Sequence, residues 1–98
     1  MNIVTKNEAE KITFEIEGRI DSTTAPELNN VVQESIEGVK ELVFDFKQVE
    51  YISSAGLRVL LSAQKKMNEQ GTMVITNVSE NIMSVFEVTG FVGILNIR

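Results

Sequence analysis

Two adjacent serines, Ser53 and Ser54, stand where a predicted strand ends and a predicted helix begins. A serine in this position commonly caps the helix by accepting a hydrogen bond from a free backbone N–H group. The same free N–H groups, together with the positive end of the helix dipole, would stabilise a phosphoryl group on either serine. The pair is therefore a candidate phosphorylation site as well as a helix cap.

A glycine, Gly56, follows within the first predicted turn of the same helix. Glycine inside a helix costs about 1 kcal/mol relative to alanine, so its presence needs a reason. The absence of a side chain indicates a close approach at this point, either by a neighbouring strand or by a partner molecule.

A second polar segment, Gly18 to Asp21 followed by Thr23 and Thr24, marks another passage from strand to helix. Taken alone, it is typical of a tight turn and a helix cap. If the helix that follows crosses over into the sheet, both polar segments lie after strands and at the same edge. Open α/β sheets place their ligand sites at such an edge, so the two segments can form one surface.

Composition excludes several other kinds of chemistry. The 98 residues include 9 basic and 14 acidic side chains, for a net charge of −5, and neither cysteine nor histidine. An acidic chain lacks the basic face that nucleic acid requires. Disulfides, zinc–thiolate sites and a Ser-His triad are impossible without cysteine and histidine. We predict no catalytic residue, metal or cofactor.

No stretch approaches eighteen uninterrupted apolar residues, and the first residues turn polar within six positions. We therefore expect a cytoplasmic protein without membrane insertion.

Hydrophobic periodicity predicts an α/β order of elements within a single domain. The predicted elements are strands over 3–5 and 12–16 across a polar turn at 6–10, a helix from about 21 to a stop at Gly38, a strand over 42–46, a helix from 54 to Gly71, a strand over 72–76, a helix from 79 to Gly90, and a short edge strand in the apolar tail 91–98. The apolar run at 42–46 predicts a strand in mid-sheet that is covered on both faces.

Three blocks of this sequence resemble the STAS domain of bacterial anti-sigma factor antagonists. They are GRIDSTTA at 18–25, FDF at 44–46 and VEYISSAGLRVL at 49–60, and the resemblance extends to NVS at 77–79, VF at 85–86 and TGF at 89–91. It implies that residues 1–98 form one STAS domain, with a mixed sheet of four to five strands against about three to four helices.

The resemblance also implies a function. Small proteins of this family are phosphorylated on a serine by an anti-sigma factor that is also a serine kinase, and a PP2C-type phosphatase reverses the modification. The unphosphorylated form, expected to be a monomer, binds the kinase and releases its sigma factor or other target. The family's acceptor corresponds to Ser54, with Ser53 as the competing candidate. Residues expected at the partner-binding surface are Asp21, Thr23, Thr24, Ser53, Gly56 and Arg58.

Two positions depart from the family pattern. Ser53 stands where many members carry an aspartate, which removes a negative charge and leaves Ser53 as a possible acceptor or cap. Ala55 stands where a second hydroxyl residue is common, which favours Ser54. The segment SSAGLR is similar to members that switch partners other than sigma factors.

Two other functions stay open. Asp21, Asp45 and Ser54 could surround a magnesium–nucleotide complex, because hard oxygen ligands suit Mg²⁺. However, no phosphate-binding glycine loop precedes a lysine, so we predict a binder and kinase substrate rather than an enzyme. Alternatively, the chain could be a non-switching assembly subunit, as some STAS-like domains are in lipid transport complexes.

Overall fold

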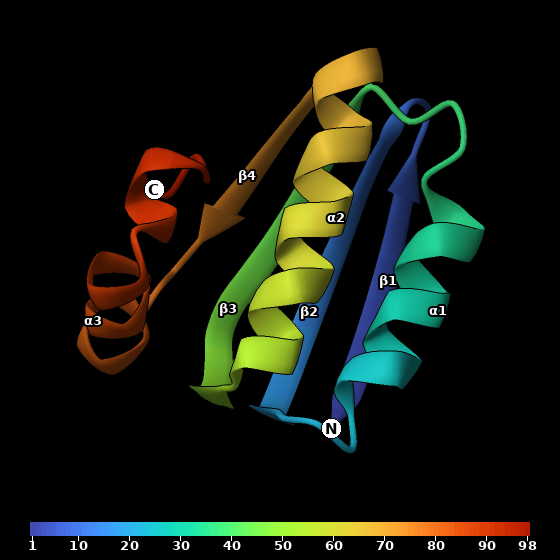
Figure 1. Ribbon diagram of the computed structural model, residues 1–98. Helices are drawn as coiled ribbons and strands as arrows, with labels where there is room; N and C mark the ends of the chain where they lie inside the picture. The colour runs from blue at the N-terminus through green and yellow to red at the C-terminus, as the bar shows by residue number, and fades with distance from the viewer.

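A computed structural model describes residues 1–98 as a four-stranded sheet with three α-helices (Figure 1). The elements are β1 (Asn2–Glu8), β2 (Lys11–Ile20), α1 (Ala25–Ser35), β3 (Glu41–Ile52), α2 (Ser54–Gln70), β4 (Thr72–Thr76), α3 (Glu80–Thr89) and a 3-10 turn, η1 (Phe91–Gly93). The strand order is β1-β2-β3-β4, with β1 antiparallel to β2 and the other pairs parallel. The predicted α/β class and mixed sheet are confirmed.

The first hairpin is tighter than the predicted polar turn at 6–10. Only Ala9 and Glu10 connect the strands, and Ala9 adopts a left-handed φ of 49°. Polar residues extend β1 because they pair across the sheet: the Lys6 ammonium lies 2.8 Å from the Glu15 carboxylate. The hydrogen bond to Glu15 raises the pKa of Lys6. Cross-strand pairing thus lengthens a strand whose sequence has little apolar character.

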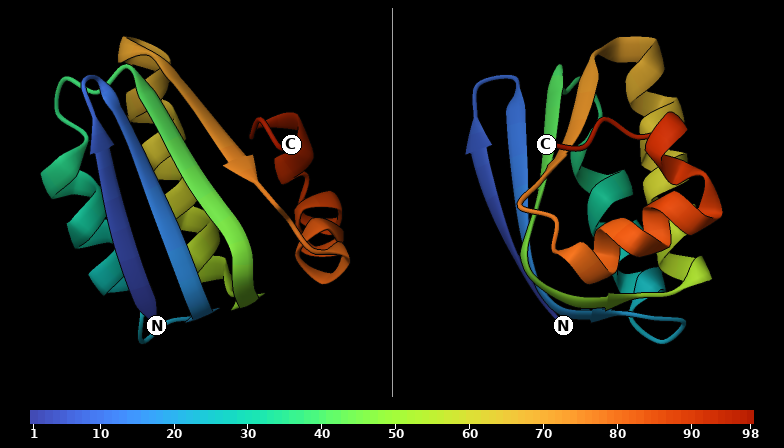
Figure 2. Two further views of the ribbon diagram at one scale, coloured as in Figure 1. Left: turned by 180° about the vertical axis from the view of Figure 1, so that it is seen from behind. Right: turned by 90° about the vertical axis from the view of Figure 1, so that its left-hand side faces the viewer.

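The helices pack against one face of the sheet, with α1 and α2 running roughly along the strands and α3 beside β4 (Figures 1 and 2). Leu42, Phe44 and Phe46 are buried on this face, where the Phe46 ring lies 6.3 Å from that of Phe86 in α3. Val43 and Asp45 point to the other face and are half-exposed. The prediction that 42–46 is covered on both faces is therefore wrong, although its place in mid-sheet is right.

β3 runs six residues beyond the predicted strand and ends at Ile52. Its buried residues shift from every second to every third position at Phe46, Val49 and Ile52. The register against β2 shifts twice along this stretch, so bulges return each third residue to the covered face. The right-hand view of Figure 2 shows this end of β3 bending beneath the helices. The bend places the end of β3 next to the start of α2.

The tail forms η1 and then a single bridge between Ile75 and Ile97, in place of a strand. Two hydrogen bonds hold it: the Ile75 N–H donates to the Asn96 carbonyl at 2.9 Å, and the Arg98 N–H donates to the Ile75 carbonyl at 2.8 Å. Leu95 is buried beside them. The tail thus covers part of the β4 edge. No helix is both long and apolar enough to span a membrane.

Candidate functional site

The two polar segments singled out in the sequence meet at one edge of the sheet. β2 and β3 are parallel neighbours, and Ile20 pairs with Ile52 at their carboxyl ends. The Ser53 N–H donates a hydrogen bond to the Ile20 carbonyl at 2.8 Å, which joins the two segments directly. The prediction that both lie on one edge is confirmed.

The two serines occupy different positions at the start of α2. Ser53 is the N-cap, and its Oγ accepts a hydrogen bond from the Gly56 N–H at 3.3 Å. Ser54 is the first residue of the helix and is exposed, and its hydroxyl forms no hydrogen bond within the protein. No acidic residue lies in this first turn. Ser53 therefore caps the helix, which leaves the Ser54 hydroxyl accessible.

Gly56 is buried against the neighbouring strand. A Cβ at this position would lie 2.7 Å from both Ile20 Cγ2 and Ile52 Cγ1, and 3.2 Å from the Ile20 carbonyl oxygen. The close approach indicated by this glycine is thus to the ends of β2 and β3, and Gly56 is buried there, whereas the other residues predicted at the partner-binding surface are exposed or half-buried. Its small size lets α2 begin directly above the ends of two strands.

Asp21 organises the turn between β2 and α1. Its Oδ1 accepts hydrogen bonds from the N–H groups of Thr23 and Thr24, each at 3.0 Å. The Thr24 hydroxyl accepts from the Asp21 N–H and donates to the Arg19 carbonyl, both at 2.8 Å. Chiefly because of the Thr24 backbone N–H, the pKa of the Asp21 carboxyl lies below its ordinary value. The polar groups of this turn are largely bonded to one another, whereas Thr23 is exposed.

An arginine–tyrosine pair stands beside this turn and was not among the predicted site residues. The Arg19 guanidinium lies 4.3 Å from the centroid of the Tyr51 ring, and its Nε is 3.7 Å from Asp21 Oδ2. Both side chains are exposed at the carboxyl ends of β2 and β3. Only the register of the two strands brings them together, so no local sequence signal could have identified the pair.

Arg58, another predicted surface residue, lies one turn into α2 and is exposed. It lines a groove between the start of α1 and α2, in which it is the one charged residue. The lining residues are Ser22, Ala25, Pro26, Asn29, Ala55, Arg58, Val59 and Ser62. The groove provides a mostly neutral surface next to the exposed serine.

The three residues considered for a magnesium–nucleotide site are not brought together. Asp45 pairs with Glu15, and Ile52 at the end of β3 pairs with Ile20. Five residues of β2 separate these two levels, or about 16 Å along the strand. The Asp45 carboxylate accepts hydrogen bonds from the Lys47 N–H at 3.0 Å and the Asn77 side chain at 3.1 Å. No three acidic residues in the structure lie together as a metal-binding group.

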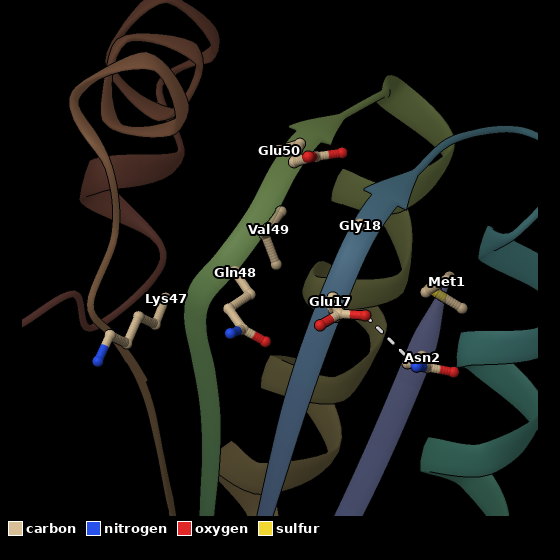
Figure 3. A pocket seen from close by; sticks show the side chains of 8 residues that line it. All are labelled: Met1, Asn2, Glu17, Gly18, Lys47, Gln48, Val49 and Glu50. Carbon is tan, nitrogen blue, oxygen red and sulfur yellow. Dashed lines mark hydrogen bonds between the residues drawn. The ribbon is translucent and has the colours of Figure 1, made fainter.

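A pocket, distinct from the groove beside Arg58, lies on the sheet face that the helices leave open, where β3 bulges away from β2 (Figure 3). Glu17, Lys47 and Glu50 are its charged lining residues, and the Lys47 side chain points away from the two carboxylates. Asn2 Nδ2 donates a hydrogen bond to Glu17 at 3.4 Å. None of the predicted site residues lines this pocket, and its polar groups do not converge on a common point.

This fold and site define a small α/β domain whose exposed serine lies at the junction of a central strand and a helix. The family model of the STAS domain matches residues 1–98, and the chain belongs to this family. The chain is 31% identical over 98 residues to the anti-sigma-B factor antagonist of Bacillus subtilis, a match that covers 99% of this chain and 90% of that protein.

Solved structures share the fold. A crystal structure of an anti-sigma factor antagonist from Mycobacterium paratuberculosis superimposes with a TM-score of 0.90 at 19% identity, covering 99% of this chain and 84% of that one. The unphosphorylated form of the anti-sigma factor antagonist SpoIIAA superimposes with a TM-score of 0.78 at 14% identity, covering 99% and 87%. The predicted family and fold are thus confirmed.

Proposed function

We propose that this chain is a phosphorylation-controlled partner switch. In its unphosphorylated form it binds an anti-sigma factor that is also a serine kinase, which then releases a sigma factor or another target. The accessible Ser54 hydroxyl at the start of α2 carries this proposal, because Ser53 already supplies the cap. The family and its named anti-sigma factor antagonists support the same role. Among the structural neighbours, SpoIIAA has also been solved in a phosphorylated form.

In the proposed reaction the Ser54 Oγ attacks the γ-phosphorus of ATP bound to the kinase. ADP leaves, and the hydroxyl proton passes to a base that the kinase supplies. A PP2C-type phosphatase then uses water to break the phosphoester bond, which restores the hydroxyl and releases inorganic phosphate. This chain supplies the acceptor oxygen and the docking surface for both enzymes.

The phosphate changes the surface and leaves the fold intact. It adds a charge of about −1.5 to −2 at pH 7, at the end of a helix whose dipole favours negative charge. A partner surface shaped for a bare hydroxyl must then bury an uncompensated dianion, which costs several kcal/mol. Loss of complementarity therefore releases the kinase, without unfolding of the chain.

Tandem mass spectrometry of the chain, purified from its own cells with phosphatase inhibitors present, tests the acceptor. We expect phosphate on Ser54, its loss in Ser54→Ala and its retention in Ser53→Ala. Phosphate found only on Ser53, Thr23 or Thr24 would contradict the assignment.

A binding measurement with the kinase tests the switch itself. Ser54→Ala should bind the kinase as tightly as the unmodified chain, whereas phosphorylation should weaken binding at least tenfold. Equal affinity of the two forms would rule out partner switching. Amide NMR spectra should differ only around Ser54 and Asp21, because the fold is unchanged.

A further inference from the structure

Arg58 is a guanidinium without a partner, one helical turn from the proposed acceptor. It is exposed and takes part in none of the ion pairs or the cation–π contact of the protein. Because α2 begins at Ser54, the two residues stand at positions i and i+4 of one helix. Side chains at this spacing are neighbours on the helix surface. A long helical side chain also leans toward the N-terminus, which directs Arg58 toward Ser54.

The other guanidinium at this edge is already engaged. Arg19 lies over the Tyr51 ring and beside the Asp21 carboxylate. That carboxylate in turn accepts two backbone hydrogen bonds in the β2–α1 turn. Moving Arg19 to a phosphate would break these contacts, whereas Arg58 has no ion pair or cation–π contact to lose when it turns.

We propose that Arg58 becomes the intramolecular counterion of the Ser54 phosphate, and that phosphorylation thereby withdraws Arg58 from the partner-binding surface. This inference rests on the proposed acceptor. An acidic group placed N-terminal to a basic one at i and i+4 is the favourable orientation in a helix. A guanidinium also binds phosphate oxygens through two parallel hydrogen bonds. The pairing requires only a rotamer change on the helix surface.

The consequence reaches the groove between α1 and α2. Arg58 is its one charged lining residue, so pairing with the phosphate leaves the groove without an available cation. A partner carboxylate that meets Arg58 in the unphosphorylated state then has no counterion. The modification therefore acts twice, because it adds negative charge beside the groove and removes the positive charge from within it.

Phosphorus NMR tests the pairing on a chain that carries phosphoserine at position 54, introduced during translation. Phosphoserine loses its second proton near pH 6, and a paired cation lowers that pKa. An i,i+4 pair predicts that Arg58→Gln raises the phosphate pKa by about 0.15–0.4 unit. Arg58→Lys should restore part of the difference, and added salt should reduce it.

Two variants serve as matched controls. Lys65→Gln removes the same charge from the same helix, but eleven residues from Ser54, or about 16 Å along the axis, and should leave the phosphate pKa unchanged. Arg19→Gln removes the engaged guanidinium. Equal titration curves for Arg58→Gln and Lys65→Gln would overturn the pairing, as would a larger shift in Arg19→Gln than in Arg58→Gln.

The test is independent of the kinase, because the phosphate is introduced without it. If cells phosphorylate another residue, the proposed function fails while the NMR measurement of Arg58 still stands. If Ser54 is the acceptor in cells but Arg58→Gln leaves the titration unchanged, the counterion role fails and the partner switch is unaffected.

Discussion

The two strand-to-helix junctions at the edge of the sheet differ in how many of their polar side chains bond to the backbone. In the turn after β2, the Asp21 carboxylate and the Thr24 hydroxyl are bonded to neighbouring backbone groups. At the start of α2, Ser53 bonds inward while the Ser54 hydroxyl stays outside. The first junction thus holds three consecutive hydroxyl residues, Ser22 to Thr24, and the second holds two. In each, one hydroxyl residue bonds to the backbone, whereas Ser22, Thr23 and Ser54 are exposed.

The polar residues at the two junctions therefore fall into two groups, one that stabilises the fold and one that is exposed. Hydroxyls that satisfy backbone groups at a turn contribute to stability, because an unsatisfied partly buried group costs free energy when they are removed. An exposed hydroxyl with no hydrogen-bond partner in the protein can be modified without loss of a structural hydrogen bond. Stability measurements on matched variants therefore distinguish a structural residue from a candidate recognition residue.

The largest expected loss of stability comes from adding a side chain at Gly56, where α2 contacts the ends of β2 and β3. Gly56→Ala places a Cβ 2.7 Å from Ile20 and Ile52, so we expect a loss of about 1–3 kcal/mol of unfolding free energy. Urea denaturation measures it. The same change at Gly93, where a Cβ would meet nothing within 4 Å, is the control. Similar stability of the two variants would mean that the strand ends do not constrain α2.

Within the β2–α1 turn, the two threonines should differ. Thr24→Val removes the hydroxyl that bonds to the Asp21 N–H and the Arg19 carbonyl, which should cost about 1–2 kcal/mol. Thr23→Val removes an exposed hydroxyl with no bond in the protein and should change stability by less than about 0.5 kcal/mol. Thermal or urea unfolding compares them. Equal losses would show that the distinction between bonded and exposed hydroxyls is wrong here.

At the start of α2, the serines should divide in the same manner. Ser53→Ala deletes the N-cap and should lower stability by about 1 kcal/mol. Ser54→Ala should have an effect below about 0.5 kcal/mol, while it abolishes phosphorylation. Urea melts and a phosphorylation assay of both variants provide the comparison. A more destabilising Ser54→Ala would reverse the roles assigned to the two serines.

The smallest effect concerns Asp21 and pH. Its pKa is lowered from 3.8 by hydrogen bonds that exist only in the folded chain, so its ionised form adds stability above about pH 4. That contribution is lost as the pH falls through the lowered pKa. Asp21→Asn keeps the acceptor oxygen but does not titrate. The free energy of unfolding of the parent, relative to that of Asp21→Asn, should therefore decrease as the pH falls below about 4. Parallel stability curves down to about pH 2 would exclude this linkage.

Much of the fold could be predicted because it depends on local periodicity and caps. The alternation at Ile12, Phe14 and Ile16 corresponds to β2, and the strand predicted over 72–76 has the bounds of β4. Ser79 and Gly90 cap α3 as expected, because a serine hydroxyl and a left-handed glycine satisfy free backbone groups at helix ends. These interactions involve residues only a few positions apart.

Other features depend on contacts between distant segments. The exposed second face of β3 follows from the placement of all three helices on the opposite face, and the extension of β3 to Ile52 follows from bulges against β2. Periodicity cannot identify a strand in which every third residue is buried, because a regular strand buries every second one.

The candidate site was determined partly at each level. The sequence alone identified Ser53 and Ser54 as a helix start and Asp21 as a turn residue, since caps and turns are local hydrogen-bonding choices. Only the tertiary structure decided that Ser53 is the cap, that Gly56 packs against the ends of β2 and β3, and that Arg19 lies over Tyr51. The register of β2 and β3 places Arg19 beside Tyr51 and Ile20 beside Ile52, which determines what Arg19 and Gly56 contact. Ser53 bonds to the Ile20 carbonyl and caps α2, and Ser54 is left exposed beside it.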